Sequence, residues 1–483
     1  MPTTVTETAA GSGTTNGSGI TIQDPRTGEV LWTVPEAEPD AVRDAVNVAR
    51  SAAPGWAATP PAGRGAALRA AAKALDAAAR ELAGLNASET GRPEDEALAG
   101  IGAAVSTLEQ YAELGPVHRG HSLRGNRLAT DYTLAEPRGV AVLLTPWNDP
   151  VAVACGLIGA ALVTGNTVIH KPSERCPRLG EALGEVLAAA FPAGVFLTLS
   201  GGAGVGAALA QAEVDVIAHV GSSSSGARIA GAGALTGAHV IRENGGNDPL
   251  LVDRDVNPAW AAEQAAIGAF SNSGQICTAV ERIYVHKDIA AEFCKALEAE
   301  AALRNSNGIV APLVDRRMRD AVHAQVAEAL EQGARAVEGG TLPDGPGSFY
   351  PATVLLGCTD GMQVMTEETF GPVAPVQVVD SFDDGLRLAC SGRYGLAATV
   401  LSSNIAHIQQ AVAALPVGTV KVNGVFGGAP GGAAQPRGES GAGFGYGPEL
   451  LDEFTQVKVV HISAPPAPAD PGTGSVIDEQ DLP

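Results

Sequence analysis

Residues 139–171 read GVAVLLTPWNDPVAVACGLIGAALVTGNTVIHK and decide the fold class. The apolar runs at the two ends are short and β-branched, as in buried strands, and the charge-free stretch between them has helical length. Gly165 and Asn166 separate the helix from the second strand, so the stretch is not a membrane span. The alternation continues to residue 243, with strands near 139–145, 166–171, 194–200, 214–220 and 239–243 and helices near 150–164, 178–190, 204–212 and 225–235. Five strands alternating with four helices predict right-handed crossovers and a doubly wound parallel sheet.

A second α/β unit is predicted from the pattern after residue 244. Its strands are expected near 249–253, 281–286, 373–379, 396–403 and 418–424, with a helix ending near 270 and another over 289–301. Ahead of the first sheet, apolar residues at helical spacing predict two helices, and a third that ends at Leu114. Residues 119–138 are typical of a projecting hairpin, and QVKVVHI, from residue 456, of a late edge strand.

Length and composition exclude several classes of protein. The 483 residues are 45% hydrophobic and 17% charged, which indicates a globular chain of two or three domains. A net charge of −22 argues against nucleic acid or an anionic membrane as a partner. Six cysteines without a C-x-x-C pair favour a reducing cytoplasm and no metal site. The N-terminus lacks the features of a signal peptide, and the Pro- and Asp-rich tail is expected to be disordered.

Polar, glycine-rich segments follow each strand of the first sheet. They read T-P-W-N, H-K-P-S-E, S-G-G-A-G, G-S-S-S-S-G and R-E-N-G-G in chain order. Because open parallel sheets bind ligands at the carboxyl ends of their strands, we expect an anionic, hydroxyl-bearing ligand such as a dinucleotide at this edge. A G-x-G-x-x-A match at Gly202, Gly204 and Ala207 adds little, since a tight turn explains it equally well. The sequence contains neither a G-x-S-x-G hydrolase elbow nor an H-E-x-x-H zinc motif.

Two residues are candidates for covalent and acid–base chemistry. Cys277 lies in F-S-N-S-G-Q-I-C-T-A, a small and polar stretch between a helix and a strand, where a nucleophile is accessible. The alternative is a buried structural thiol, which is what we expect of the other five cysteines. Glu243 ends the apolar strand HVIRE, so partial desolvation should raise its pKa as a general base requires. The alternative for Glu243 is a salt bridge to Arg242 or a surface position.

Six motifs stand in the order and spacing of the NAD(P)-dependent aldehyde dehydrogenase superfamily, which the chain resembles from about residue 20 to about residue 462. They are P-W-N-D-P, K-P-S-E, V-G-S-S-S-S-G, E-N-G-G, G-Q-I-C and E-E-T-F-G-P-V, and the separation of 34 positions from Glu243 to Cys277 also matches. The resemblance implies that Cys277 adds to an aldehyde carbonyl while Asn148 and the Cys277 N–H hold the oxyanion. Hydride then passes to nicotinamide, and water activated by Glu243 hydrolyses the thioester. The site must favour the thiolate through nearby dipoles or the cationic nicotinamide ring.

The resemblance also implies the contacts of the cofactor. From the adenosine ribose to the nicotinamide ribose, the expected residues are Lys171, Glu174, Trp147, Ser222, Glu368 and Phe370, with Thr145, Pro146, Ser173, Gly202 and Gly221 completing the set. A carboxylate at Glu174 would accept the ribose hydroxyls and repel a 2′-phosphate. NAD is therefore expected as the cofactor, with NADP less favoured.

Three features depart from the pattern of the family. Asn244 stands where E-L-G-G has leucine, Asp149 stands where P-W-N-F-P has an aromatic residue, and GGAAQPRGESGAGFGYG, from residue 431, lacks the usual lysine. These positions bear on the substrate entrance and the nicotinamide side. They leave the expected reaction class unchanged.

The expected substrate follows from three positions of the tunnel. Asp149, Gly156 and Ser271 fall where many relatives carry aromatic side chains, which predicts a polar and roomier pocket. The stretches I-H-K-P-S and N-S-G-Q-I-C-x-x-x-E-R-I-Y-V also resemble lactaldehyde and glycolaldehyde dehydrogenases. We expect a small hydroxylated or otherwise polar aldehyde. The alternative is an aromatic aldehyde enclosed by Phe426 or Phe444.

Other interpretations belong to different classes of protein. A cysteine hydrolase would pair Cys277 with one of the nine histidines, none of which is near it in the sequence. A non-catalytic relative of the fold would not be expected to retain Cys277, Glu243 and Asn148 together. An acylating relative would pass the thioester to coenzyme A or phosphate, and a water-activating Glu243 argues against it.

The expected domains follow from the resemblance. They are a flexible N-terminus at 1–19, a dinucleotide-binding domain at 20–118 and 139–244, an oligomerisation element at 119–138 and 455–463, a catalytic domain at 245–454, and a disordered tail at 464–483. We expect a homodimer or homotetramer in which the late strand pairs with the 119–138 hairpin of a second subunit, because an unpaired apolar edge invites uncontrolled association.

Overall fold

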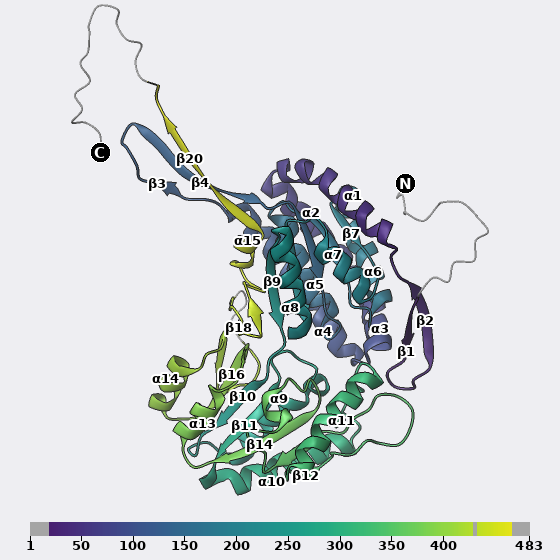
Figure 1. Ribbon diagram of the computed structural model, residues 1–483, viewed down its shortest axis with the longest axis vertical. Coiled ribbons are helices and arrows are strands. Elements are labelled where there is room, and N and C mark those ends of the chain that lie inside the picture. Colours follow the sequence, from purple (N-terminus) through teal and green to yellow (C-terminus); the bar gives the residue numbers. More distant parts are fainter. Residues whose placement is uncertain (1–18, 428–431, 466–483) are drawn as a thin grey trace, which may run out of the picture.

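Two parallel β-sheets organise the chain in the computed structural model, which describes residues 19–427 and 432–465 (Figure 1). One sheet has six strands and the other seven, and each is parallel except for the strand at one edge. This confirms the predicted α/β class. The expected flexible N-terminus and disordered tail fall outside the described residues, apart from residues 19, 464 and 465.

The six-stranded sheet contains the five predicted strands in parallel. They are β5 (Val140–Leu144), β6 (Thr167–Lys171), β7 (Phe196–Thr198), β8 (Val216–Gly221) and β9 (His239–Asn244), joined by α5 (Pro150–Val163), α6 (Pro177–Ala188), α7 (Ala203–Gln211) and α8 (Ser223–Thr236). The order β9-β8-β5-β6-β7 puts the first strand in the middle, with β6 on one side and β8 on the other. The chain reverses its direction of winding at β5, and such a switch point is where open α/β sheets bind ligands.

Both faces of this sheet are buried by helices. Alternate residues of β5 belong to different clusters, because Ala141 and Leu143 pack on one side while Val140 and Val142 pack on the other. The helices ahead of the sheet are α1 (Pro39–Ala58), α2 (Pro61–Ala77), α3 (Ala79–Thr90) and α4 (Glu94–Leu114). There are four where three were predicted, because the stretch that contains Leu68 and Leu82 breaks near Ala78. Burial on two faces explains why the strands are continuously apolar.

The charge-free stretch from Val151 to Ile169 forms α5 and then β6, as predicted. Gly165 lies in the turn between them with φ of +100°, a conformation that favours glycine. Among the described residues, no helix combines the length and the apolar character needed to cross a membrane.

The seven-stranded sheet has the order β12-β13-β14-β11-β10-β16-β17. Its strands are β10 (Asp248–Val252), β11 (Val280–His286), β12 (Arg335–Glu338), β13 (Thr353–Leu356), β14 (Val373–Val379), β16 (Ala397–Leu401) and β17 (Thr419–Val422). Its helices are α9 (Pro258–Phe270), α10 (Lys287–Ser306), α11 (Arg316–Glu331), α12 (Gln363–Thr366), α13 (Phe382–Ala389) and α14 (Ile405–Ala414). All the strands expected after residue 244 are present, and β12 and β13 were not predicted.

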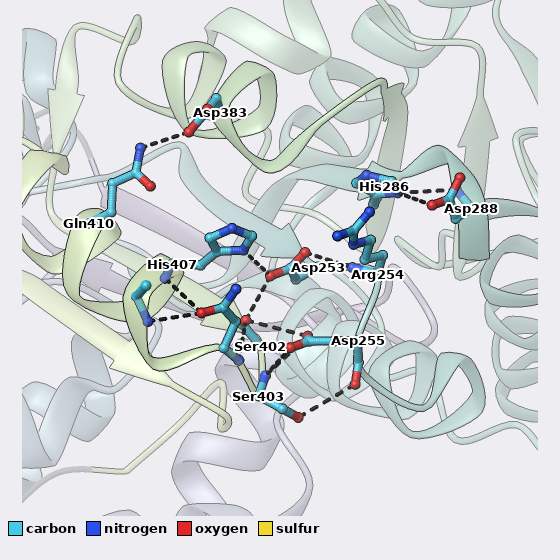
Figure 2. A network of polar contacts seen from close by, with 12 residues as sticks. Asp253, Arg254, Asp255, His286, Asp288, Asp383, Ser402, Ser403, His407 and Gln410 are labelled. Atoms are coloured by element: carbon cyan, nitrogen blue, oxygen red, sulfur yellow. Dashed lines mark hydrogen bonds and ion pairs between the residues drawn. The ribbon is translucent and has the colours of Figure 1, made fainter.

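A polar network closes the carboxyl edge of this second sheet (Figure 2). Asp253, which follows β10, is 2% exposed and accepts hydrogen bonds from Ser402 Oγ (2.7 Å), His407 Nδ1 (2.6 Å) and the Arg254 N–H (2.8 Å). Burial raises the pKa of this carboxyl, but the hydrogen bonds from His407 and Ser402 outweigh it and leave the pKa low. Serine and histidine both bond to the carboxylate and not to each other, so the network is not a hydrolytic triad.

A three-stranded antiparallel sheet projects from the body of the molecule (Figure 1). It consists of β3 (Ser122–Leu123), β4 (Ala129–Pro137) and β20 (Thr455–Ser463) in the order β20-β4-β3. The hairpin is therefore present, but the expected pairing of the late strand was wrong. β20 pairs with β4 of the same chain from Thr455 opposite Pro137 to Ser463 opposite Ala129. The two segments emerge side by side from one core, so intrachain pairing needs no second subunit.

The chain after residue 440 returns to the first sheet. The remaining short elements are β1 (Gly19–Gln23), β2 (Val30–Pro35), β15 (Tyr394–Gly395), β18 (Arg437–Gly438), β19 (Gly441–Ala442), α15 (Leu450–Glu453), and the 3-10 turns at Gly115–Val117 and Ser271–Gly274. β19 pairs with β9 at Arg242 and Glu243. Leu450 and Phe454 join the core of the first sheet. Residues 441–454 thus pack with the first unit, although they fall within the range 245–454 expected for the second.

Candidate active site

The two sheets meet at the segment 245–247, which joins β9 to β10. The carboxyl end of β9 carries Glu243, and the turn that carries Cys277 lies just before the amino end of β11. A Cβ placed on Gly246 would lie 3.0 Å from the Cys277 carbonyl oxygen. The backbone of the E-N-G-G motif therefore contacts the cysteine turn, and the carboxyl edge of one sheet meets the amino edge of the other.

The cysteine turn is held in a strained conformation. Asn272 and Ser273 have φ of +46° and +55°, and residues other than glycine adopt such backbone angles only at a cost in free energy. The Gln275 carbonyl accepts hydrogen bonds from the side-chain amides of Asn148 and Asn272, both at 3.2 Å. No described residue accepts a hydrogen bond from the Cys277 N–H. The Asn148 amide and this N–H are thus brought to the same turn.

The thiol of Cys277 is withdrawn from solvent, although the residue as a whole is partly exposed. Burial raises its pKa to about 12. Negative charges that reinforce the shift are those of Glu243, Asp248 and Glu368, and the cation that opposes it is Lys421. The described protein by itself therefore disfavours the thiolate, contrary to the expectation that its dipoles would favour it.

The other five cysteines are also free. Cys155, Cys176 and Cys358 are buried, as expected of structural thiols. Cys294 and Cys390 are only partly buried, which differs from that expectation. In the described residues, no group of three or more His, Cys, Asp or Glu side chains is arranged to hold a metal ion.

Glu243 has the environment predicted for a general base. Burial raises its pKa to about 8, and a hydrogen bond from the Gly445 backbone only partly opposes the shift. A Cβ on Gly445 would overlap this carboxylate, so a glycine is required beside it. No ion pair joins Glu243 to Arg242 among the described residues, so the alternative of a salt bridge does not hold.

Lys171 and Glu174 lie together at the carboxyl end of β6. Lys171 is 6% exposed, its Nζ donates to the Pro172 carbonyl at 2.8 Å, and it lies 3.7 Å from the Glu174 carboxylate. Ser173 is buried between them and accepts a hydrogen bond from the Arg175 N–H at 3.3 Å. Thr145, at the end of β5, bonds to His170 Nε2 at 2.8 Å. These polar residues lie at the carboxyl ends of β5 and β6 in the first sheet.

Aromatic rings cover the next part of this edge. Trp147 packs edge-on against Phe370 with ring centroids 5.6 Å apart, and Arg175 lies over the Trp147 ring. Arg175 also donates to Asp315 of the second unit at 2.8 Å. Pro146, just before the tryptophan, is buried. Trp147 thus lies between residues of both units.

Backbone N–H groups line the edge at α7 and α8. The N–H of Gly202, just before α7, donates a hydrogen bond to the Glu36 carboxylate at 2.8 Å. Ser222 caps α8 by accepting from the Ser225 N–H at 3.4 Å, and Gly221 contacts the His219 ring. Both ring nitrogens of His219 are buried without a hydrogen-bond partner among the described residues, and burial lowers its pKa to about 4. An unpartnered neutral imidazole at this turn fits a polar ligand.

Glu368 points into the junction between the two sheets. Its carboxylate accepts a hydrogen bond from the Gly246 backbone, and a Cβ on Gly245 would overlap it. Burial, together with the charges of Glu281 and Asp248, raises the pKa of Glu368 well above its usual range. The two glycines of E-N-G-G therefore make room for this side chain.

The three expected substrate positions lie in different surroundings. Asp149 forms an ion pair with Arg92 at 2.9 Å, and Ser271 donates its hydroxyl proton to the Ile267 carbonyl at 2.7 Å. A Cβ on Gly156 would lie 3.3 Å from the Tyr446 ring, so tyrosine fills the space beside that glycine. Asp149 is therefore charged and paired, and the space beside Gly156 is filled by a ring where the sequence predicts room.

The prediction from sequence missed several residues of the site. Arg92 Nη1 donates to the Asn148 carbonyl at 3.2 Å, and Lys421 Nζ donates to the Thr278 carbonyl at 3.4 Å. Asp248 and Glu281 are 4% exposed. Charged residues inside or at the start of otherwise apolar strands, as in DPLLV, VERIYVH and TVKV, are the signal that marks three of them. Arg92 lies in a turn and carries no such signal.

A carboxylate at the carboxyl end of β9 thus lies near a thiol just before β11, an arrangement compatible with nucleophilic catalysis at the ligand-binding edge of a doubly wound sheet. The chain matches the aldehyde dehydrogenase family over residues 13–460 and belongs to that family. It is 33% identical over 472 residues to betaine aldehyde dehydrogenase of Cereibacter sphaeroides, covering 94% of this chain and 95% of the relative. It is 31% identical over 456 residues to lactaldehyde dehydrogenase of Escherichia coli, covering 92% and 95%.

Solved structures agree with the family assignment. A structure of lactaldehyde dehydrogenase superposes with a TM-score of 0.89 at 30% identity, covering 92% of this chain and 96% of the other. A structure of PnpE in complex with nicotinamide adenine dinucleotide superposes with a TM-score of 0.89 at 29% identity, covering 93% and 96%. The protein is thus an NAD(P)-dependent aldehyde dehydrogenase.

Proposed function

We propose that the protein oxidises a small polar aldehyde to the carboxylic acid through a covalent adduct on Cys277, with NAD as the hydride acceptor. The observation that carries the proposal is the junction where Cys277, Glu243 and the Asn148 amide come from three separate elements to one turn. Among the described residues, no hydrogen bond links Cys277 to a histidine, so the cysteine hydrolase has no support.

The residues of the protein account for the covalent steps. The Cys277 thiol gives up its proton to water, Sγ bonds to the carbonyl carbon, and the carbonyl oxygen takes the π electron pair and the negative charge. The Asn148 Nδ2 amide and the Cys277 N–H then stabilise that oxyanion, at about 3 kcal/mol for each donor. A bound nicotinamide ring would be the acceptor of the hydride that leaves this carbon, and its positive charge would lower the pKa of the thiol. The oxyanion collapses to leave a thioester on Cys277.

Glu243 completes the reaction as a base. A deprotonated Glu243 takes a proton from water, the resulting hydroxide attacks the thioester carbonyl, and Cys277 leaves as the thiolate. Its pKa of about 8 is matched to this role near neutral pH, because the carboxylate is basic enough to accept the proton. The same base disfavours transfer of the acyl group to coenzyme A or phosphate.

The residues at the carboxyl edge support NAD rather than NADP. Lys171 and Glu174 would bond to the ribose hydroxyls, and the Glu174 carboxylate is 44% exposed and unfavourable to a 2′-phosphate. Trp147 would lie beneath the dinucleotide, Ser222 with the α8 N–H groups would meet the pyrophosphate, and Glu368 with Phe370 the nicotinamide ribose. His219 adds an unpartnered buried imidazole to this edge. The ratio of kcat/KM for NAD and NADP tests the choice.

A polar substrate is supported by the Arg92–Asp149 ion pair next to Asn148 and by the lactaldehyde and betaine aldehyde dehydrogenases among the relatives. An aromatic aldehyde is the alternative, with Phe426, which is 39% exposed, or Phe444 as the residue that would enclose it. Comparing kcat/KM for lactaldehyde and glycolaldehyde with hexanal and benzaldehyde decides between them. A clear preference for the second pair would overturn the polar assignment.

The location is part of the same proposal. All six cysteines are free, and burial raises the pKa of each thiol. A reducing cytoplasm suits such a chain. Fractionation of the source cells tests it.

A further inference from the structure

We propose that Glu281 is a positioning residue that fixes the nicotinamide-side segment 368–370 relative to the nucleophile. This proposal rests on the function proposed above, because it assigns that segment to the cofactor. Glu281 lies in β11, four residues after Cys277, and is 4% exposed. A charge so deeply buried requires hydrogen-bond partners, and those partners show what it does.

The Glu281 carboxylate accepts three hydrogen bonds from two segments. Oε1 accepts from the Phe370 N–H at 2.8 Å, and Oε2 accepts from the Thr369 N–H at 3.0 Å. Oε2 also accepts from Asn247 Nδ2 at 3.2 Å. Two consecutive backbone N–H groups on one carboxylate fix both the position and the orientation of the segment that carries Phe370.

The segment needs this support because its backbone is strained. Phe370 has φ of +52°, which a side chain of its size rarely adopts without external contacts. Its ring packs against Trp147, and the preceding Glu368 enters the space over the two glycines. Loss of the Glu281 bonds would let the segment relax, moving both side chains away from the cofactor edge.

Asn247, in the segment that joins β9 to β10, links the same carboxylate to the chain just before Glu368. Asn247 Nδ2 also donates to the Glu367 carbonyl at 3.0 Å, and the Asn247 carbonyl accepts from Arg282 Nε at 2.8 Å. The pair Glu281–Arg282 therefore holds Asn247 by both its side chain and its backbone. Three segments, from β10, β11 and the loop before β14, converge on this pair.

Glutamine at position 281 tests the proposal. It preserves the shape but leaves one acceptor oxygen and turns an NH₂ group toward backbone donors. We expect Glu281→Gln to raise KM for NAD about ten-fold, the effect of losing a hydrogen bond to a charged group. Turnover of p-nitrophenyl acetate without cofactor, which needs Cys277 but not the segment 368–370, should stay within about two-fold of wild type.

Asp253→Asn is the matched control. Asp253 is also a buried carboxylate with three donors (Figure 2). It lies at the opposite end of β10 from the residues that pair near Glu281, roughly 15 Å away at about 3.3 Å per residue. It should lower thermal stability without separating the two activities. If Glu281→Gln leaves KM for NAD within two-fold of wild type, or if both activities fall together, the proposal is wrong.

A second variant, Gln325→Ala, tests the same proposal if the Glu281→Gln protein does not fold. Gln325 on α11 holds the same segment from its outer side, donating to the Glu368 carbonyl at 3.1 Å and accepting from Thr369 Oγ1 at 3.0 Å. It should raise KM for NAD several-fold with unchanged esterase turnover, and equal losses in both would overturn the proposal. Absence of NADH formation by the wild type with every aldehyde would instead defeat the proposed function.

Discussion

The thiol of Cys277 lies among buried acids and needs a source of positive charge. Glu243, Asp248 and Glu368 all act to keep it protonated, and Lys421 is the cation that opposes them. A cofactor that brings a cationic ring to this point would reverse the balance. The proposed mechanism therefore implies a nucleophile that is weak until the cofactor binds.

Alkylation of the free enzyme should reflect the raised pKa of Cys277. Without cofactor, the rate of its reaction with iodoacetamide should rise about ten-fold for each pH unit from 7 to 10, since the rate follows the thiolate fraction below the pKa. Peptide mass spectrometry separates Cys277 from the partly exposed Cys294 and Cys390. A plateau below pH 9 would show that the protein alone stabilises the thiolate.

Hydrolysis of the thioester should depend on pH through Glu243. Its pKa of about 8 means that the carboxylate is largely protonated at pH 7, and only the deprotonated form can accept a proton. The rate of acyl-enzyme hydrolysis should therefore increase as pH rises to about 8 and level off above it. Stopped-flow measurement of the single-turnover step checks this, and Glu243→Gln should be slow at every pH. A wild-type rate that is already constant at pH 6 would contradict the assignment.

The turn between α3 and α4 acts on the site from the first unit. α3 ends at Thr90 with Gly91 at φ of +79°, and α4 begins at Glu94, so Arg92 projects from a short connection toward the start of α5. There it contacts the Asn148 carbonyl and the Asp149 carboxylate. The turn thereby orients the amide expected to hold the oxyanion.

Replacing Arg92 should affect the chemical step. Arg92→Met leaves Asp149 without its cation and removes the donor to the Asn148 carbonyl, and we expect kcat to fall about ten-fold, the equivalent of one lost charge-assisted hydrogen bond. Arg43→Met, which removes an exposed ion pair with Asp40 on α1, is the control and should leave kcat unchanged. Steady-state kinetics at saturating NAD checks both. Equal kcat for Arg92→Met and wild type would show that Asn148 needs no such support.

The sequence predicted the elements of the fold better than the contacts between them. Apolar runs and the order of motifs placed the five strands of the first sheet, Cys277 and Glu243, because those signals are local. Arg92 and Glu281 were not predicted from the sequence, because their contacts form only where segments distant in the sequence meet. The pairing of β20 was wrong for the same reason, since an edge strand shows its need for a partner but not which chain supplies it.

At the scale of the whole molecule, the projecting sheet of β3, β4 and β20 has exposed apolar side chains that no other described residue covers. Val457 and Val459 share one face of β20 and are 72% and 65% exposed, and β20 remains at the edge of its sheet. An apolar edge strand of this kind favours association with another chain. We therefore retain the proposal of a dimer or a dimer of dimers.

Sedimentation velocity at micromolar concentration tests the oligomer. The wild type should sediment as a dimer or tetramer, and a double substitution of Val457→Lys and Val459→Lys should shift it toward the monomer, because two desolvated charges would oppose the interface. Lys458 points to the other face and pairs with Glu136 of β4, so Lys458→Gln is the control. A monomeric wild type would reject the proposal.

The covalent step is the central claim of the mechanism, and mass spectrometry of the Glu243→Gln variant tests it most directly. Incubated with lactaldehyde and NAD and then quenched in acid, this variant should carry one acyl group on the peptide that contains Cys277, because the thioester forms but its hydrolysis lacks a base. Cys277→Ala treated in the same way should carry none and form no NADH. NADH formation without an acyl group on Cys277, or by the Cys277→Ala variant, would contradict the account.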